Sequence, residues 1–482
     1  MMKGLRTLYR KLLKFKVVPL ILIMISLLLC ISVSIKAQES APASTSHPTP
    51  ILKKTKFFSQ NEKNTAHIDG TIEKAPIKNV LRQLSTVTGW RIFMEPGLSY
   101  TVDSKFKNLP PHEALPLIFG TRNYALVSDG KNGQRLLVFV KNQDAATESI
   151  RPDLSEPIPN ELILILKKGS KLTPQEIAQL IGGKILAISK SGNAIRFSFE
   201  DKEAVAKAKE ILAKLIESNT IDSIQNNYYM ISPEAALGVA ASGLKIPREV
   251  TLTPGTGTTI AMIDSAPHTE GVYYSDVLMD PVYFIDPKNA PLSSDPTHAD
   301  SLLGSSLYWL HNSGYDSLDF NYLPLVVLDS SGNGDSFSVA EAVLYADAAG
   351  ADVINLSLSG DGYSPYLADA IRTAINNGKI VTAAAGNEPT GQVTYPAGYE
   401  GVIGVTALEN GQIASYANQG NFVDAAVAGT GLFYFDESWF LSTGTSISTI
   451  YLSSMVAAEM SAGGKTAEQA LSSILTKFGY KK

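Results

Sequence analysis

The sequence predicts an α/β fold in which helices cover both faces of a large parallel sheet, with two small α+β modules in front of it. Length is the first observation, because 482 residues exceed what one hydrophobic core normally holds. The second is residues 231–482, where continuous apolar strands alternate with helical stretches, as in parallel sheets that are buried on both faces. The third is a pair of shorter segments, residues 67–143 and 160–230, which each mix helical and strand periodicity.

The charge and the cysteine content exclude several classes of function. The formal net charge is −5, so there is no electrostatic argument for a nucleic-acid partner. The only cysteine is Cys30. Disulfides, thiolate zinc sites and thiol catalysis are therefore excluded downstream of it.

Residues 1–37 carry the pattern of an export signal. Basic side chains precede an almost unbroken apolar run over residues 17–35, and Ala37 follows shortly after it. The run nearly spans a bilayer, so a cleaved signal peptide and an uncleaved signal anchor both stay open. Residues 38–66 read as a flexible linker. We expect an exported protein, periplasmic or extracellular, with attachment to the membrane as the alternative.

The first module, residues 67–143, shows two helices and two strands. Apolar residues at helical spacing start at Ile77, a strand covers residues 91–94, a second helix begins at Pro111, and a last strand covers residues 136–140. Its pattern is carried by Ala75-Pro76-Ile77-Lys78-Asn79-Val80-Leu81, Thr88-Gly89-Trp90 and Leu109-Pro110-Pro111-His112-Glu113-Ala114-Leu115. It resembles the small N-terminal domain of secretins and TonB-dependent receptors. The resemblance implies a contact with another envelope protein.

The second module follows a polar linker, residues 144–159, and covers residues 160–230. Thr173 and Glu176 form a capping box around a proline at the first helical position. Ser191-Gly192-Asn193 is a hairpin turn between two strands, and Asp201 can cap a long second helix. The order βαββαβ predicts an antiparallel sheet with both helices on one face, a ferredoxin-like arrangement.

The third segment, residues 231–482, alternates strands with helices. Helices are predicted at residues 338–349 and 366–377. The predicted strands are residues 259–263, 325–328, 353–358, 380–385 and 402–407. Functional groups then belong at the carboxyl ends of the strands. Asp264 and Asn387 stand there, whereas Ser446 precedes an apolar helical run, where a helix N-terminus favours negative charge.

Four motifs follow one another in the third segment. They are Ile263-Asp264-Ser265, His298-Ala299-Asp300-Ser301-Leu302-Leu303-Gly304, Ala385-Gly386-Asn387-Glu388 and Gly444-Thr445-Ser446-Ile447-Ser448. Other matching stretches include Val326-Val327-Leu328-Asp329-Ser330-Ser331-Gly332-Asn333-Gly334, Asp352-Val353-Ile354-Asn355-Leu356-Ser357-Leu358 and Tyr395-Pro396-Ala397. The residue types in these motifs, and their order along the chain, resemble those of the subtilisin-like (subtilase) serine proteases.

This resemblance implies a role for each matched residue. Ser446 would be the nucleophile, His298 the general base and Asp264 its orienting carboxylate, while Asn387 would stabilise the oxyanion. The substrate would bind along Ser357, Leu358, Ser359, Gly360, Ala385 and Gly386. The second module would be the propeptide, which in this family assists folding and blocks the cleft, with processing between residues 224 and 247.

The choice of base follows from counting histidines. This segment holds only His268, His298 and His311. His268 is too close in sequence to Asp264 to reach it comfortably from another element, and His311 is expected to lie one helix too late. An alternative alignment puts Asp295 at the position of the base and leaves none. The first alignment is preferred because Gly304 then falls on the glycine of the family's helix.

Several departures from the family pattern bear on activity. Asp300 adds a carboxylate near the imidazole and is expected to change its basicity. Ala266 and Ser359 replace glycines and are expected to narrow the groove, whereas Ile450 and Tyr451 change packing at the serine helix.

We therefore expect an exported serine endopeptidase that is made as a precursor and acts on protein or peptide substrates through an acyl-enzyme. A catalytically inactive subtilase fold that serves envelope assembly is the alternative, and a hydrolase of non-peptide acyl groups is a third. No cofactor is required. Calcium is common in this family but no full ligand set is found, and the acidic residues 316–319 are expected to form a solvated turn.

Overall fold

The structure is a computed structural model that describes residues 58–480, except 62–63, 89, 96–97, 129–133, 144–145, 147, 151–153, 233–250, 253–256, 314–316 and 319. The export segment, most of the first linker, Asp316 and Asp319 lie outside the described residues. So does the later part of the expected processing range. Within the described part of the chain, every helix is too short or too polar to be a transmembrane span.

The first group of elements forms two sheets and two helices. The elements are β1 (Phe58–Asn61), β2 (Asn64–Pro76), α3 (Ile77–Thr88), β3 (Arg91–Met94), β4 (Thr101–Leu109), α4 (Pro111–Phe119), β5 (Asn123–Ser128), β6 (Gln134–Phe139) and β7 (Glu148–Ile150). One sheet has the order β1-β2-β4 and the other β5-β6-β3-β7. The predicted helices and strands are present as α3, β3, α4 and β6. Strands β1, β2, β4, β5 and β7 were not predicted.

The second group has the predicted order βαββαβ. It consists of β8 (Glu161–Leu166), α5 (Pro174–Ile181), β9 (Lys184–Ile188), β10 (Ala194–Ser198), α6 (Lys202–Glu217) and β11 (Ile221–Gln225). All pairs in the sheet β11-β8-β10-β9 are antiparallel. The Thr173–Glu176 capping box and the Asp201 cap both form, as predicted.

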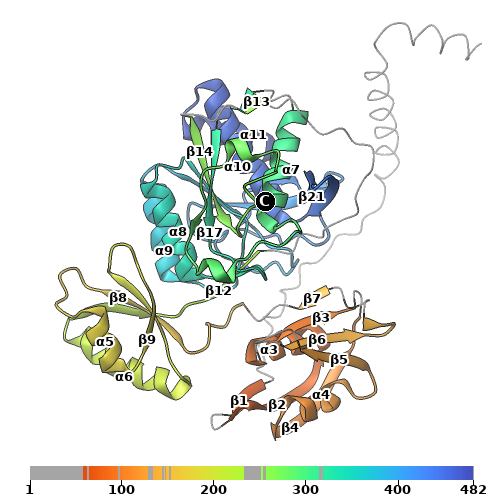
Figure 1. Ribbon diagram of the computed structural model, residues 1–482, viewed down its shortest axis with the longest axis vertical. Helices are drawn as coiled ribbons and strands as arrows, with labels where there is room; N and C mark the ends of the chain where they lie inside the picture. Colours follow the sequence, from red (N-terminus) through yellow and green to blue (C-terminus); the bar gives the residue numbers. More distant parts are fainter. Residues whose placement is uncertain are drawn as a thin grey trace, which may run out of the picture. The chain divides into compact units, whose positions relative to one another are not determined.

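Residues of β8 alternate between two faces of this sheet. Leu162 and Leu164 pack with Ile177 of α5 and Leu212 of α6, so both helices cover one face (Figure 1). Ile163, in contrast, belongs to the core of the third group. Strand alternation thus leaves an apolar face of this sheet for the third group.

The third group is the largest. Its strands are β12 (Tyr229–Ile231), β13 (Thr251–Leu252), β14 (Thr258–Asp264), β15 (Val282–Tyr283), β16 (Ser317–Leu318), β17 (Phe320–Val326), β18 (Asn333–Asp335), β19 (Val353–Leu356), β20 (Ile380–Ala384), β21 (Ile403–Glu409), β22 (Gln412–Ile413), β23 (Ala425–Ala428), β24 (Thr430–Phe435) and β25 (Ser438–Thr443). Its helices are α7 (His298–Asn312), α8 (Ser336–Ala348), α9 (Pro365–Asn376), α10 (Thr445–Gly463) and α11 (Ala467–Phe478), with short 3₁₀ turns at Ser275–Val277 and Pro287–Asn289.

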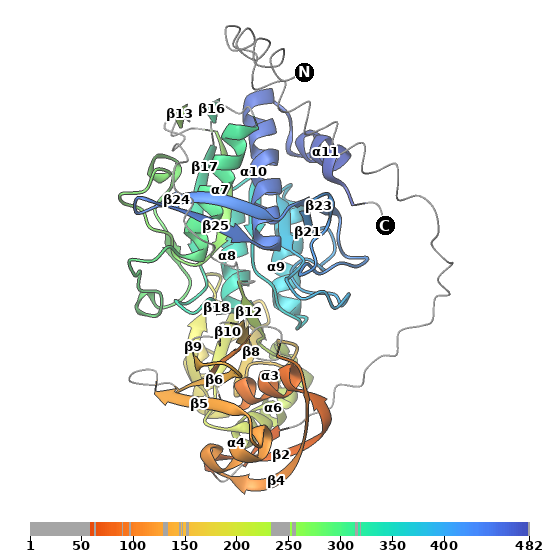
Figure 2. The same ribbon diagram turned by 90° about the vertical axis from the view of Figure 1, so that its right-hand side faces the viewer.

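The central sheet confirms the predicted parallel architecture. Its order is β15-β17-β14-β19-β20-β21, β23 also pairs with β21, and only β22 is antiparallel. In β14, Ala261 packs with α8 and α9, whereas Ile260 packs with α7, α10 and α11. Helices therefore cover both faces, as Figure 1 shows. The β24–β25 hairpin, which was not predicted, runs beside α7 (Figure 2).

Candidate active site

Asp264 is the last residue of β14, in the middle of the parallel sheet. Its side chain is fully buried. The Oδ1 atom accepts a hydrogen bond from the backbone N–H of Ser265 at 2.7 Å and lies 2.8 Å from Nδ1 of His298. The carboxyl end of a central strand thus presents a buried carboxylate to an imidazole.

His298 is the first residue of α7. Thr297 caps this helix, and the backbone N–H of Ala299 donates to Oγ of Ser265 at 3.1 Å, which ties the start of α7 to the end of β14. The Nε2 atom of His298 is buried and has no hydrogen-bond partner among the described residues. The imidazole is therefore oriented through Nδ1, while Nε2 is available for proton transfer.

The carboxylate of Asp300 pairs with a different histidine, His268. Its oxygens accept hydrogen bonds from Tyr274 Oη at 2.7 Å and from the backbone of Thr297 and His268, and Oδ2 lies 2.6 Å from Nδ1 of His268. These contacts fix the loop after β14 to the first turn of α7. The expected effect of Asp300 on His298 stays a prediction.

The other two histidines lie elsewhere. His268 pairs with Asp300 rather than Asp264. His311 was expected one helix too late, and this was wrong, because it lies in the last turn of α7, the same helix that begins at His298. His298, and not Asp295, faces Asp264.

Ser446 is the second residue of α10 and is fully buried. Its Oγ donates to the carbonyl of Ser357 at 3.2 Å, and Oγ of Ser357 donates to the carbonyl of Ser446 at 3.0 Å. Ile447 of α10 packs in one cluster with Ala299 and Leu302 of α7. Packing of α10 against α7 therefore holds the segment that follows Ser446 against the helix that begins at His298.

Asn387 supports the start of α10. Its Oδ1 accepts from the backbone N–H of Thr445 at 2.9 Å and from Thr445 Oγ1 at 3.0 Å. A Cβ atom at Gly444 would lie 2.9 Å from Nδ2 of Asn387, so a side chain at that position would displace the amide. The first N–H groups of a helix lack partners within the helix, and the helix dipole favours an anion there.

The six expected substrate-binding residues have different surroundings. Leu358 and Ala385 are core residues, and Gly386 donates its N–H to Thr445 Oγ1 at 3.2 Å. The backbone of Gly360 pairs with Tyr395. Ser357 contacts Ser446, and Ser359 has its backbone N–H and carbonyl bound to Ile231.

Strand β12 lies between two segments of the third group. Tyr229–Ile231 pairs antiparallel with β18, and the backbone of Ile231 exchanges hydrogen bonds with Ser359 at 3.0 and 2.8 Å. Antiparallel pairing in this register runs from Ser359 towards Ser357, whose carbonyl contacts Ser446. The chain's own strand thus pairs with the backbone two residues after Ser357. No sequence signal for this strand was recognised, because its partners lie about 100 residues or more away.

Comparison with protein families decides the classification of part of this group. The model of the subtilase family matches residues 318–476, a range that includes Asn387 and Ser446 and starts after Asp264 and His298. Residues 318–476 belong to the subtilase family.

Two curated proteins show the similarity in sequence. A thermophilic serine proteinase of Bacillus sp. (strain AK1) is 41% identical over 108 residues, which are 22% of this chain and 27% of that protein. Thermitase of Thermoactinomyces vulgaris is 28% identical over 230 residues, 46% of this chain and 82% of thermitase. The chain thus spans less than two thirds of the first relative and a larger share of the second.

Solved structures show the same fold. Fervidolysin from Fervidobacterium pennivorans, described as a keratinolytic enzyme related to subtilisin, matches with a TM-score of 0.50 and 15% identity over 65% of this chain and 56% of that one. The epidermin leader peptide processing serine protease of Staphylococcus aureus gives a TM-score of 0.50 and 15% identity over 65% of this chain and 92% of that one.

The departures from the subtilase pattern have local explanations. Ala266 is buried beside Val326, and its expected effect on the groove stays a prediction. Ser359 pairs through its backbone with Ile231. Tyr451 stacks on Trp309 and donates to the carbonyl of Thr430 at 3.2 Å, which accords with the expected change in packing.

The described part of the chain was searched for clusters of side chains that could bind a metal ion. No group of three or more His, Cys, Asp or Glu side chains there could hold an ion.

Proposed function

We propose that this chain is an exported serine endopeptidase, made as a precursor, that hydrolyses peptide bonds in protein or peptide substrates. The contact of 2.8 Å between Asp264 Oδ1 and His298 Nδ1 carries the proposal. It supplies the general base that an inactive subtilase fold would lack. The similarity to a thermophilic serine proteinase supports the reaction class.

The reaction assigns one step to each side chain. Ser446 Oγ turns from the carbonyl of Ser357 towards His298 and attacks the substrate carbonyl carbon, while Nε2 takes the proton. The C–N bond then breaks, and Nε2 gives that proton to the leaving amine. Water next attacks the acyl-enzyme, loses a proton to Nε2, and releases the acid as the proton returns to Ser446. Asp264 keeps Nδ1 protonated and stabilises the imidazolium throughout.

The oxyanion of each tetrahedral intermediate is assigned to the start of α10. Asn387 binds Thr445 through Oδ1, which leaves its Nδ2 as the donor group of the amide. The N-terminal position of Ser446 in a long helix adds a favourable dipole. No metal or organic cofactor is needed for these steps.

Residues 160–230 are proposed as the propeptide and residues 231–482 as the catalytic domain. The support is strand β12, which pairs with β18 and with Ser359, in a register that continues from Ser359 towards Ser357. A substrate would replace this strand and pair with the backbone of Ser359 in the same way. Processing would fall between residues 224 and 247, a range that includes β12.

The segments that precede residue 160 are proposed to serve export and contacts with other proteins. Residues 1–37 would direct export, with cleavage or anchoring both compatible with the sequence. The expected linkers 38–66 and 144–159 were wrong in part, because β1, the start of β2 and β7 lie within them and pair in the sheets of the first group. Residues 67–143 would bind another envelope protein. The extracellular protease Epr of Bacillus subtilis, 31% identical over 168 residues, supports export.

Intact mass measurement with a fluorophosphonate probe tests the proposal. The full chain should gain one probe adduct on Ser446 and lose a fragment that contains residues 160–230, and Ser446→Ala should do neither. A folded wild-type chain that shows neither change would overturn the proposal and favour the inactive alternative.

A further inference from the structure

The imidazole of His268 lies between two hydrogen-bond acceptors. Its Nδ1 atom is 2.6 Å from Oδ2 of Asp300, and its Nε2 atom is 2.9 Å from the carbonyl oxygen of Ser293. A carbonyl oxygen has no proton to donate, so Nε2 forms this bond only if it carries a hydrogen. The protonation of Nδ1 then depends on the charge of Asp300.

The contacts of Asp300 favour its ionised form. Its side chain is fully buried, and three donors besides the imidazole reach its oxygens. Oδ1 accepts from the backbone N–H of His268 at 2.8 Å and from Tyr274 Oη at 2.7 Å, and Oδ2 accepts from the backbone N–H of Thr297 at 2.7 Å. Such donors stabilise the charged form of a carboxylate, which is an acceptor only. Nδ1 of His268 must therefore donate as well.

Acceptors at both ring nitrogens require a doubly protonated imidazole. A neutral imidazole carries one N–H, and its other nitrogen would face either Asp300 or Ser293 with a lone pair. The side chain of His268 is 18% exposed and that of Asp300 is not exposed at all, so water compensates little for a lost bond. His268 and Asp300 therefore form an ion pair and not a neutral hydrogen bond.

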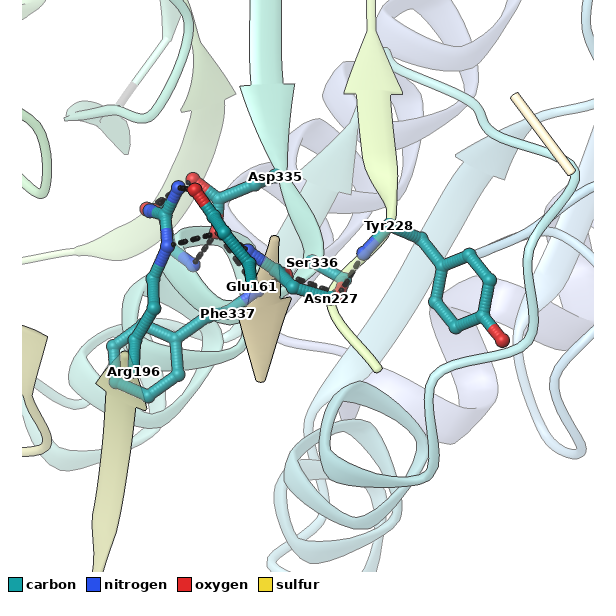
Figure 3. Close-up of polar contacts among 8 residues, drawn as sticks. Glu161, Arg196, Asn227, Tyr228, Asp335, Ser336 and Phe337 are labelled. Atoms are coloured by element: carbon teal, nitrogen blue, oxygen red, sulfur yellow. Dashed lines mark hydrogen bonds and ion pairs between the residues drawn. The ribbon is translucent and has the colours of Figure 1, made fainter. Parts of the chain in front are cut away.

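Another ion cluster of the chain uses a cation that does not titrate. Arg196 donates to Glu161 at 2.8 Å and to Asp335 at 2.7 Å (Figure 3). A guanidinium is not deprotonated in proteins, whereas an imidazolium loses a proton near neutral pH unless its partners hold it. Of these two clusters, only the pair of His268 and Asp300 can respond to pH in that range.

The other groups around the imidazole are uncharged or acidic. The ring of Phe435 lies edge-on to it, with 4.8 Å between the ring centroids. His298, two residues before Asp300, turns its Nδ1 to Asp264 instead. Four exposed acidic residues lie close to His268, Ser293 or Phe435 along the chain, namely Glu270, Asp295, Asp436 and Glu437. Exposed carboxylates favour a nearby imidazolium only weakly, so Asp300 is the partner that decides its charge.

The imidazole joins three segments around the proposed base. His268 lies in the loop after β14, Ser293 in the segment before α7, and Asp300 in the first turn of α7. His298 begins that same turn. Two N–H groups hold all three segments together, and a neutral ring would release one of them.

We infer that His268 is a positioning residue for the proposed base and acts as an imidazolium, with one N–H directed to Asp300 and the other to the carbonyl of Ser293. Loss of either proton breaks one of the two bonds, and the first turn of α7 then holds His298 less firmly. The effect on catalysis rests on the proposed function, whereas the charge of the imidazole does not.

Nitrogen NMR of the full chain carrying Ser446→Ala, with nitrogen-15 in its histidines, tests the charge without any proteolysis. The chain has six histidines, and His268→Gln assigns the signals of His268 by removing them. At about pH 7.5 an ordinary exposed imidazole is mostly neutral, and exposed His112 is the reference in the same spectrum. Both nitrogens of His268 should carry a proton at this pH. An unprotonated nitrogen in His268 would overturn the inference.

A variant of the partner tests what holds the second proton. Asp300→Asn removes the charge at nearly constant volume and keeps an oxygen that can accept from the backbone of Thr297. His268 should then lose one proton and become neutral at about pH 7.5. Asp295→Asn is the matched control, because Asp295 is exposed, and it should leave both nitrogens of His268 protonated. A doubly protonated His268 in Asp300→Asn would overturn the ion pair.

The pH dependence of kcat, measured with Ser446 intact, tests the positioning role. The kcat of the wild type should fall about 10-fold, with KM nearly unchanged, over the pH range in which the imidazolium signal of His268 disappears. His268→Gln should have the lower kcat throughout and no such fall, because glutamine does not titrate. His311→Gln, at the other end of α7, should follow the wild type.

The outcomes separate the positioning role from the proposed function. A wild-type kcat that stays level while the imidazolium signal disappears would overturn the role of His268 in positioning the base. A doubly protonated His268 in the Ser446→Ala chain, together with no hydrolysis by the folded chain with Ser446 intact, would support the ion pair and reject the proposed protease.

Discussion

His268 and Asp300 form a second histidine–carboxylate pair beside the first, with 2.6 Å between Nδ1 and Oδ2. Asp300 is the third residue of α7 and His298 the first. Burial and then the Asp300 carboxylate raise the pKa of Tyr274, so its hydroxyl stays protonated and donates to the same carboxylate. The loop after β14 and the first turn of α7 are thus joined next to the proposed base.

His268→Gln should lower kcat about 10-fold or more and leave KM nearly unchanged, because a small displacement of the base costs rate rather than binding. Steady-state kinetics on a peptide substrate measures both. His311→Gln, at the other end of α7, is the control and should keep the wild-type kcat. Equal losses in the two variants would mean that His268 only stabilises the helix.

Asp264→Asn should lower kcat by about 10⁴, since an amide at this position favours the wrong imidazole tautomer, as in other serine proteases. The measurement is kcat at a pH where the wild type is fully active. Asp295→Asn is the matched control, because Asp295 is exposed. A large loss in Asp295→Asn, with activity kept in Asp264→Asn, would restore the alternative alignment.

Asn387→Ala should lower kcat by about 10²–10³, the loss measured when the corresponding donor of subtilisin is removed. Part of this loss can arise through Thr445, which binds Asn387 Oδ1. Asn387→Asp separates the two effects, since it keeps an acceptor for Thr445 and removes the donor. Activity near the wild-type level in Asn387→Asp would exclude the oxyanion role.

The features that the sequence predicted are those with local causes. Thr173 and Glu176, which form the capping box, are three residues apart, and Asp201 accepts from the backbone of Ala204, also three residues on. The geometry of each cap therefore follows from its local motif. The strands of the parallel sheet, such as β14 and β20, are continuous apolar runs. Both of their faces are buried, so an unbroken apolar run is enough to predict them without any alternation of polar and apolar residues.

The missed features depend on distant partners. Strand β2 is mostly polar, and in its described part only Ile72 and Ala75 are buried apolar residues. The alternation of apolar and polar residues that predicts a strand is therefore weak in this segment. The partners of Asp300 come from elements 26 and 32 residues away, and those of Ile231 from more than 100 residues away. No local pattern records such contacts, which is why neither the pairing of Asp300 with His268 nor strand β12 was predicted.

Gly360→Ala should raise KM for long peptide substrates about 10-fold. A Cβ atom there would lie 2.5 Å from the carbonyl oxygen of Tyr229 and 3.2 Å from the sulfur of Met230, so it would meet any strand that occupies the place of β12. Kinetics with an extended peptide and with a short ester that does not reach Gly360 gives the comparison. A similar rise in KM for both substrates would show a general disturbance of the site instead.

Alkaline pH should destabilise the fold through its buried tyrosines. Burial raises the pKa of Tyr322 from 10.0 to about 12, although its bonds with Ser306 and Ser454 partly oppose the shift. Between these two values the unfolded chain releases the phenolic proton and the native chain keeps it, so the native state binds more protons and its stability falls as pH rises. The loss from Tyr322 alone is about 1.4 kcal/mol per pH unit in this window, and none is expected below pH 10. Urea midpoints of the Ser446→Ala chain between pH 9 and 12 measure it. Tyr322→Phe should flatten the decline, because the remaining hydroxyls of Ser306 and Ser454 do not ionise there, and an unchanged slope would assign the decline to other groups.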